Sequence, residues 1–344
     1  MSTVQHTPVR FGFQNEAAHR FPQLILVALT SPCNAQCPHC PSTPANDGGE
    51  IRRTPGPDGN QENFLRPEWY KNMSDECATY GARLRLSSYG ETMLHPKFVE
   101  LVEYSSDRGV PTSIITNGSL LTPAKAECLI RAGVESIEIS METHDPELYP
   151  KLKVGLKFEK VLQNLKALRE IRDRLWSNPV GNHLTTKLRT FIIVSIVNQP
   201  KNPTIKEAEA FYQGIADHVS IRAFLTWGLD SLENQNPSRN HYLKNSTPCP
   251  YPYERCMVDP AGYIRLCPYD DQKKISPFGH LSTNSISETW QGVRWNEIRS
   301  CHGETFDTEA AATKAPLCEH CSDRRNRSWT FNYISIAAAK SGRG

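Results

Sequence analysis

Short apolar runs alternate with longer amphipathic segments over the first two thirds of the chain. A short apolar run indicates a buried strand, whereas apolar residues at every third or fourth position indicate a helix. We therefore expect strands at 24–29, 84–88, 113–115, 136–140, 191–197 and 219–225. Helices are expected between them, at 66–80, 97–108, 122–133, 158–175 and 204–217.

Local signals support several of these helix ends. Thr122 followed by Pro123 is typical of a helix start, and Gly133 is typical of a helix end. Thr204 and Glu207 have the spacing of a capping box. Strands that alternate with helices in this way predict an α/β fold, with a parallel sheet and helices outside it.

The same pattern suggests where the chain divides. Residues 43–63 are rich in glycine, proline and polar side chains and predict a long exposed loop. The alternation stops near residue 234. We expect an N-terminal extension at 1–21, a large unit at 22–230, a linker at 231–244, a small unit at 245–328 and a tail at 329–344.

Composition narrows the classes of function. The chain has 39 basic and 37 acidic residues, which is no electrostatic footprint for nucleic acid or an anionic membrane. No apolar run approaches the roughly 18 residues of a membrane span, and the N-terminus lacks the apolar region of a signal peptide. Eleven cysteines without a secretion signal therefore predict a reducing, cytoplasmic compartment and thiolates that serve metal.

Three cysteines follow the first predicted strand. Cys33, Cys37 and Cys40 have the spacing C-x3-C-x2-C. Three thiolates can hold three irons of a cubic 4Fe–4S cluster and leave the fourth iron without a protein ligand. Zinc, the alternative, takes four ligands, commonly from paired C-x2-C elements. The spacing matches the signature of the radical S-adenosylmethionine (SAM) superfamily, and His39 fills a position that is usually aromatic there.

This resemblance implies a fold and a chemistry. The fold is a partial (β/α)6 TIM-like barrel, whose chemistry lies at the carboxyl ends of the strands. The open iron binds the amino and carboxylate groups of SAM, and one electron cleaves SAM to methionine and a 5′-deoxyadenosyl radical. The radical then abstracts a hydrogen atom from a substrate. The resemblance also implies a flavodoxin- or ferredoxin-type electron donor.

Residues at the ends of later strands match motifs that contact SAM in this family. They are Tyr89, Gly90, Glu91, Asn117, Ser140, Val197 and Arg222. The resemblance assigns the SAM ammonium to Glu91, although Tyr89 replaces the usual first glycine of the motif. Asn117 is a candidate for the adenosine side. Ser140 is a candidate for the ribose or methionine carboxylate, with the capping of a turn as the alternative. Val197 is a candidate for adenine packing. Arg222 is a candidate for a SAM or substrate carboxylate, with a surface role as the alternative.

A second cysteine group follows the alternating part of the chain. It consists of Cys249, Cys267, Cys318 and Cys321. A turn at 259–262 predicts a hairpin that brings Cys249 and Cys267 together. Cys256 competes with Cys249 for the first position, but it lies too close to Gly262 for the pattern. Four such cysteines suit either an iron–sulfur cluster or a zinc ribbon.

The second group resembles the auxiliary-cluster module of the SPASM/twitch branch. The chain lacks the further C-x5-C-x3-C of a full SPASM pattern, so the resemblance implies one auxiliary 4Fe–4S cluster. A cluster with four protein thiolates has no position for a substrate, so its natural role is to accept or conduct electrons. That favours net oxidation, as in the 2-deoxy-scyllo-inosamine dehydrogenase-like enzymes of natural-product biosynthesis.

The leading hypothesis is thus a radical SAM oxidoreductase acting on a sugar- or aminocyclitol-like small molecule. One alternative is modification of a ribosomal peptide by crosslinking, thioether formation or epimerisation. Others are redox-neutral decarboxylation or epimerisation of a sugar acid, and a non-catalytic iron–sulfur or zinc protein. The candidates for lining the substrate pocket are Tyr89, Glu142, Trp227 and the loop at 43–63.

Overall fold

The computed structural model describes most of the α/β part of the chain and much of the C-terminal part. The described residues are 19–43, 55–59, 62–87, 89–177, 189–198, 205–224, 249–268, 270, 277–303, 306–319 and 321. Our predictions for Thr204, Trp227, the linker at 231–244, the tail at 329–344 and most of the loop at 43–63 lie outside them.

One sheet runs through the described structure. Its strands are β1 (Leu24–Val27), β2 (Arg83–Leu86), β3 (Thr112–Thr116), β4 (Ser136–Ser140), β5 (Phe191–Asn198), β6 (His218–Ala223), β7 (Arg255–Val258), β8 (Tyr263–Arg265) and β9 (Gly279–His280). Their order is β6-β5-β4-β3-β2-β1-β7-β8-β9. Strands β1 to β6 pair in parallel, which confirms the predicted α/β class.

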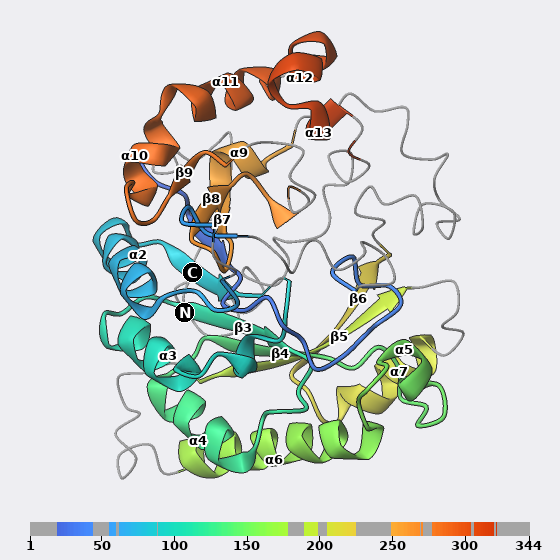
Figure 1. The fold of residues 1–344 in the computed structure, drawn as a ribbon. Coiled ribbons are helices and arrows are strands. Elements are labelled where there is room, and N and C mark those ends of the chain that lie inside the picture. The colour runs from blue at the N-terminus through green and yellow to red at the C-terminus, as the bar shows by residue number, and fades with distance from the viewer. Residues whose placement is uncertain are drawn as a thin grey trace, which may run out of the picture.

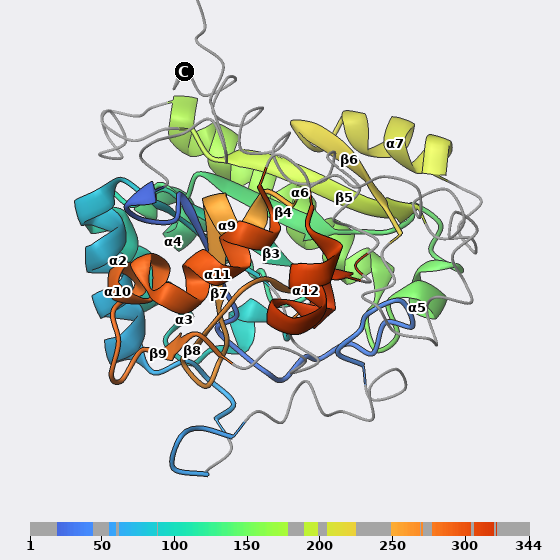
Figure 2. The ribbon, with the colours of Figure 1, turned by 90° about the horizontal axis from the view of Figure 1, so that it is seen from above.

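Helices pack against this sheet and against one another. They are α2 (Pro67–Tyr80), α3 (Phe98–Asp107), α4 (Pro123–Ala132), α5 (Tyr149–Leu152), α6 (Phe158–Ser177), α7 (Ile205–Gln213), α9 (Tyr251–Glu254), α10 (Ile286–Gln291), α11 (Val293–Cys301), α12 (Thr308–Lys314) and α13 (Pro316–Glu319), with a 3-10 turn η3 (Thr92–Leu94). In Figure 1, α10 to α13 lie together at the top of the molecule, and α4 and α6 lie on the opposite side at the bottom. The C-terminal helices α11 and α12 face the viewer in Figure 2.

The local signals place the helix ends as predicted. The Thr122 hydroxyl accepts a hydrogen bond from Lys125 N at 3.3 Å, and Gly133 adopts a left-handed φ of 78° after α4. Neither α5 nor η3 was predicted, because each spans only one short turn and leaves no apolar repeat in the sequence.

The predicted turn at 259–262 joins β7 to β8 in an antiparallel hairpin. Gly262 has a φ of 86°, and a Cβ atom there would lie 2.8 Å from the Trp69 ring. Strand β7 also pairs in parallel with β1, with Leu24 opposite Arg255. The hairpin therefore continues the sheet of the α/β part, a connection that the sequence pattern did not predict.

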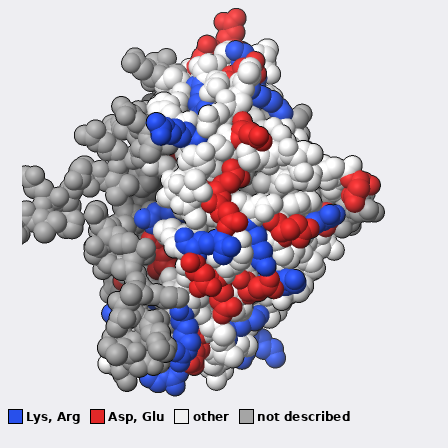
Figure 3. All heavy atoms as spheres, turned by 90° about the vertical axis from the view of Figure 1, so that its left-hand side faces the viewer, with Lys and Arg blue, Asp and Glu red and all other residues white. Residues whose placement is uncertain are grey.

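The face formed by α2 and α3 carries charges of both signs in close succession (Figure 3). Lys71 Nζ lies 2.8 Å from Glu100 Oε1, and Arg108 pairs with Asp75 on the same face. Such alternation gives this face no field of a single sign. Among the described residues, no helix is both long and apolar enough to cross a membrane.

Candidate active site

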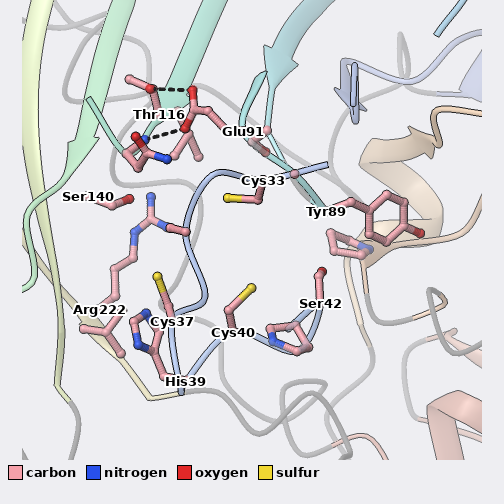
Figure 4. A pocket seen from close by; sticks show the side chains of 18 of the residues that line it. Cys33, Cys37, His39, Cys40, Ser42, Tyr89, Glu91, Thr116, Ser140 and Arg222 are labelled. Atoms are coloured by element: carbon pink, nitrogen blue, oxygen red, sulfur yellow. Dashed lines mark hydrogen bonds between the residues drawn. The ribbon is translucent and has the colours of Figure 1, made fainter. Parts of the chain in front are cut away.

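The loop after β1 carries the first three cysteines to a cavity that residues of β1 to β6 also line. Cys33, Cys37 and Cys40 all line this cavity, whose volume is about 280 Å³. Figure 4 shows their sulfur atoms turned toward a common space. The Cys40 N–H donates to the Cys37 carbonyl at 3.0 Å, which folds the loop into a tight turn.

The chemistry of these three thiols suits a metal cluster. Burial raises the pKa of the Cys37 thiol to about 11, so its thiolate needs a cationic partner. The buried Lys153 acts in the opposite direction and lowers that pKa. Three thiols turned toward one space fit a cluster with three protein ligands and one open iron.

Glu91 is held at the end of β2 by groups of its own chain. Its Oε1 accepts from Thr116 Oγ1 at 2.7 Å and from Met93 N at 3.1 Å, and its Oε2 accepts from Asn117 N at 2.8 Å. Burial raises the pKa of Glu91, and these three donors lower it. A carboxylate has about four lone-pair sites, so an acceptor position remains for an ammonium group.

Gly90 touches the cysteine loop directly. Its N–H donates to the Thr30 carbonyl at 3.1 Å. A Cβ atom at Gly90 would lie 2.2 Å from the Pro32 carbonyl oxygen. The backbone at Gly90 therefore packs directly against the cysteine loop, and a side chain there would not fit.

The other residues predicted to bind SAM also line the cavity. Asn117 Nδ2 donates to Asn34 Oδ1 at 2.8 Å and so joins the end of β3 to the cysteine loop. The hydroxyl of Ser140 accepts from Ser195 at 3.5 Å. Tyr89, with a φ of 43°, is buried beside them. The structure thus brings the predicted set together around the three thiols.

Arg222 belongs to a buried ionic network on the inner side of the sheet. It pairs with Glu138 of β4, and Arg85 Nη2 of β2 lies 2.8 Å from the other oxygen of Glu138. Both guanidinium groups line the cavity. Sequence reasoning missed Arg85, whose only signal was a charged residue inside an apolar strand.

A second buried ionic network lies beside the cysteine loop. Glu142 Oε1 is 3.7 Å from His39 Nε2 and 3.9 Å from Lys153 Nζ. Glu142 Oε2 accepts from Val197 N at 2.8 Å. Burial alone would raise the pKa of Glu142. His39 and Lys153 outweigh burial, and the pKa of Glu142 is lowered to about 2. Sequence reasoning considered Glu142 only as a pocket residue and missed Lys153.

The second cysteine group is also assembled. Cys267 and Cys318 are buried, and Cys249 and Cys321 are half-buried beside them. Burial raises the pKa of Cys267, and the thiols of Cys318, Cys321 and Cys249 raise it further. The Cys249 N–H donates to His302 Nδ1 at 3.0 Å, which fixes the first member of the group.

The structure separates Cys256 from this group. Cys256 is buried on β7, where it acts electrostatically on Cys77 of α2. Cys301, by contrast, lies near Cys318, and its thiol donates to the Glu297 carbonyl of its own helix at 3.4 Å. Of the two competitors for the first position, Cys249 is therefore the one that neighbours the other three thiols.

Among the residues that the structure describes, no three Cys, His, Asp or Glu side chains lie close enough to share a single metal ion. A 4Fe–4S cluster spreads its cysteines over four irons, so its ligands lie further apart than those of one ion. The described arrangement of each cysteine group is compatible with ligands of that kind.

Comparisons with known proteins agree with this site. Residues 27–185 match the model of the radical SAM superfamily, and residues 249–322 match the SPASM iron–sulfur cluster-binding domain. The chain therefore carries a radical SAM domain in its N-terminal part. Its C-terminal part carries a SPASM domain. The first domain implies SAM and a 4Fe–4S cluster as cofactors, and the second implies auxiliary iron–sulfur binding.

Individual relatives differ in their activities. The AdoMet-dependent heme synthase of Methanosarcina barkeri is 31% identical over 153 residues, which are 43% of this chain and 40% of that protein. The PqqA peptide cyclase of Granulibacter bethesdensis is 29% identical over 220 residues, which are 63% and 52% of the two chains. This chain thus spans about half or less of the length of these curated relatives.

A solved structure shows the same fold over most of the chain. The crystal structure of BtrN in complex with AdoMet and 2-DOIA has a TM-score of 0.51 and 17% sequence identity. The similarity covers 87% of this chain and 92% of that one. At this identity the likeness concerns the fold, and it agrees with the expected partial barrel.

Proposed function

We propose that this radical SAM enzyme oxidises a small molecule by two electrons in the cavity between its two cysteine groups. The observation that carries the proposal is the lining of that cavity. Cys33, Cys37 and Cys40 form part of its wall, and Tyr251 and Pro268 form another part. Tyr251 follows Cys249 by two residues, and Pro268 is the neighbour of Cys267. The cavity therefore extends from the first cysteine group to sequence neighbours of two cysteines of the second group.

In this proposal the cavity residues hold and orient the cofactor and the substrate. Cys33, Cys37 and Cys40 are the ligands of the first cluster, and Glu91 accepts the ammonium group of SAM. Bound SAM supplies a 5′-deoxyadenosyl radical that removes a hydrogen atom from the substrate. The hydrogen bond from Asn117 to Asn34 holds the end of β3 against the cysteine loop.

The second cysteine group completes the electron balance. An alcohol carbon that becomes a carbonyl loses two hydrogens, of which the first leaves as an atom. The second leaves as a proton and an electron, and the proposed acceptor of that electron is the auxiliary cluster of Cys249, Cys267, Cys318 and Cys321. The cavity is lined in part by Pro268, the sequence neighbour of Cys267, which supports this role.

A sugar- or aminocyclitol-like substrate is the class that we favour. The first cluster and SAM would share the cavity of about 280 Å³ with the substrate, which favours a compact substrate. Its lining combines apolar walls with a few fixed polar groups from Arg85, Ser140 and Arg222. The fold-level likeness to BtrN, whose structure contains AdoMet and 2-DOIA, supports the same class.

We also propose the domain boundaries predicted from the sequence, with the core at 22–230 and the module at 245–328.

Peptide modification is the second candidate function. It is favoured by the similarity to the PqqA peptide cyclase of Granulibacter bethesdensis, which extends over 63% of this chain. In this alternative, the same cavity would receive one side chain of a peptide rather than a whole small molecule. An external one-electron donor, such as a flavodoxin or ferredoxin, is required in both cases.

The test is anaerobic reconstitution followed by cofactor analysis. We expect about eight irons per chain, as two 4Fe–4S clusters require. With dithionite and SAM we expect 5′-deoxyadenosine, and with an aminocyclitol a product lighter by two hydrogens. Absence of SAM cleavage would contradict the proposed enzyme class. A product obtained only with a peptide would favour the second candidate.

A further inference from the structure

Lys153 places an ammonium group inside the protein beside the cysteine loop. Its side chain is only 6% exposed, and it lines the same cavity as Cys33 and Cys37. The carboxylate of Glu142 lies 3.9 Å from the ammonium group of Lys153. A buried lysine without such partners would be costly, so its placement requires negative charge nearby.

The backbone fixes Lys153 relative to the thiols. Lys153 ends helix α5, and its N–H donates to the Tyr149 carbonyl at 2.7 Å. The next residue, Val154, accepts a hydrogen bond from Gln36 N of the cysteine loop at 2.9 Å. Gly155 follows with a φ of 94°, and a Cβ atom there would lie 3.1 Å from the Asn34 carbonyl oxygen. The turn at 153–155 is thus attached to the cysteine loop itself.

Glu142 holds the ammonium group from the other side. Its carboxylate, anchored to Val197 N, lies 3.9 Å from Lys153 Nζ. Its backbone has a left-handed φ of 64°, which is unusual for a residue other than glycine. This conformation at the end of β4 directs the carboxylate toward both His39 and Lys153.

We propose that Lys153 is a positioning residue that sets the reduction potential of the cluster held by the first cysteine group. This inference rests on the proposed ligation by Cys33, Cys37 and Cys40. Reduction adds one negative charge to the cluster, and a buried ammonium group nearby stabilises the more negative state. Glu142 opposes this effect and holds the ammonium group in place. Lys153 therefore makes the first electron transfer easier.

The experiment is a redox titration of the reconstituted full-length chain, monitored by electron paramagnetic resonance. The signal that changes when SAM is added identifies the first cluster. We expect Lys153→Met to lower the ratio of reduced to oxidised cluster at a fixed potential about tenfold, which corresponds to a midpoint about 59 mV more negative. Lys153→Arg keeps the charge and should stay near the wild type. Lys151→Met is the matched control, because Lys151 lies on the same helix but is exposed.

The direction in which a second variant shifts the midpoint potential distinguishes an effect of charge from an effect of misfolding. Glu142→Gln keeps an acceptor for Val197 N but removes a negative charge, so it should move the midpoint to a more positive potential. An unchanged midpoint in Lys153→Met would overturn the inference, as would shifts of the same sign in both variants. If Lys153→Met loses its cluster, the Glu142→Gln shift alone decides. If the wild type shows no signal that responds to SAM, the proposed ligation fails first, and the inference fails with it.

Discussion

Gly90 is the residue at which the end of β2 meets the cysteine loop. An added Cβ atom would lie 2.2 Å from Pro32 O and 2.7 Å from Thr30 Oγ1, and a backbone oxygen has little freedom to move away. We expect Gly90→Ala to displace the loop and lower the free energy of unfolding by about 1–3 kcal/mol, as overpacking usually does. Iron analysis of the reconstituted variant should show a loss from the first cluster.

Gly214 provides the control for this substitution. A Cβ atom at Gly214 would meet nothing within 4 Å, so Gly214→Ala should change stability by less than about 0.5 kcal/mol. Equal iron content and equal melting temperatures in the two variants would contradict the assigned contact.

Single residues differ in how far the sequence predicts their place. The cysteine spacing and Glu91 are local motifs, and the structure gathers them in one cavity as expected. Lys153 could not be predicted, because its position depends on the one-turn helix α5 and on the backbone contact between Gln36 and Val154. Nothing in the surrounding sequence distinguishes it from an exposed lysine such as Lys151.

At the scale of elements, Glu76 connects α2 of the α/β part to α10 of the C-terminal part. Its two carboxylate oxygens accept from Ile286 N and Ser287 N, each at 3.0 Å. These are free backbone donors of the first turn of α10, which a carboxylate stabilises. We expect Glu76→Ala to cost about 1–2 kcal/mol, measured by denaturant unfolding under anaerobic conditions. Glu103→Ala, an exposed change on α3, should be nearly neutral.

The turn between β2 and α3 carries a pH-sensitive group. His95 Nδ1 accepts from Lys97 N at 3.1 Å, which requires the neutral ring, and Nε2 donates to the Leu65 carbonyl at 2.9 Å. Burial lowers the pKa of His95. The neutral form is therefore favoured in the fold, and its contribution is present above about pH 6.5 and lost as the pH falls through the lowered pKa.

The expected result is a melting temperature that falls as the pH is lowered from about pH 7 toward pH 5. His95→Asn cannot titrate, so its melting temperature should fall less over the same range. His19 is exposed, and His19→Asn should keep the wild-type dependence. Identical pH profiles for all three proteins would rule out His95 as the source.

The elements show the same division between local and distant signals. The six parallel strands were predicted because each is a short apolar run, and their ends moved by only a few positions. The pairing of β7 with β1 was not predicted, because it joins Leu24 to Arg255 across most of the chain. Periodicity describes which face of an element is buried, but not which distant strand lies beside it.

At the scale of the whole molecule, the pairing of β7 with β1 makes the sheet continuous from the α/β part into the C-terminal hairpin. Strand β7 is buried along its full length against β1, and the core includes Met257 and Val258. Cys318 lies in α13 and Cys321 lies just after it, so neither belongs to the β1–β7 contact. The hairpin should therefore remain folded when the auxiliary cluster is removed.

This leads to a prediction about the independence of the two clusters. Replacing both Cys318 and Cys321 with alanine should lower the iron content from about eight to about four per chain, because one of two 4Fe–4S clusters is lost. Cleavage of SAM with dithionite should persist, since the cavity around Cys33, Cys37 and Cys40 does not depend on α13. Oxidation of the substrate should stop, because the proposed acceptor of its second electron is gone. Cys128→Ala, a half-buried change on α4, should keep both clusters. An iron content that stays near eight in the double variant would show that other residues hold the second cluster.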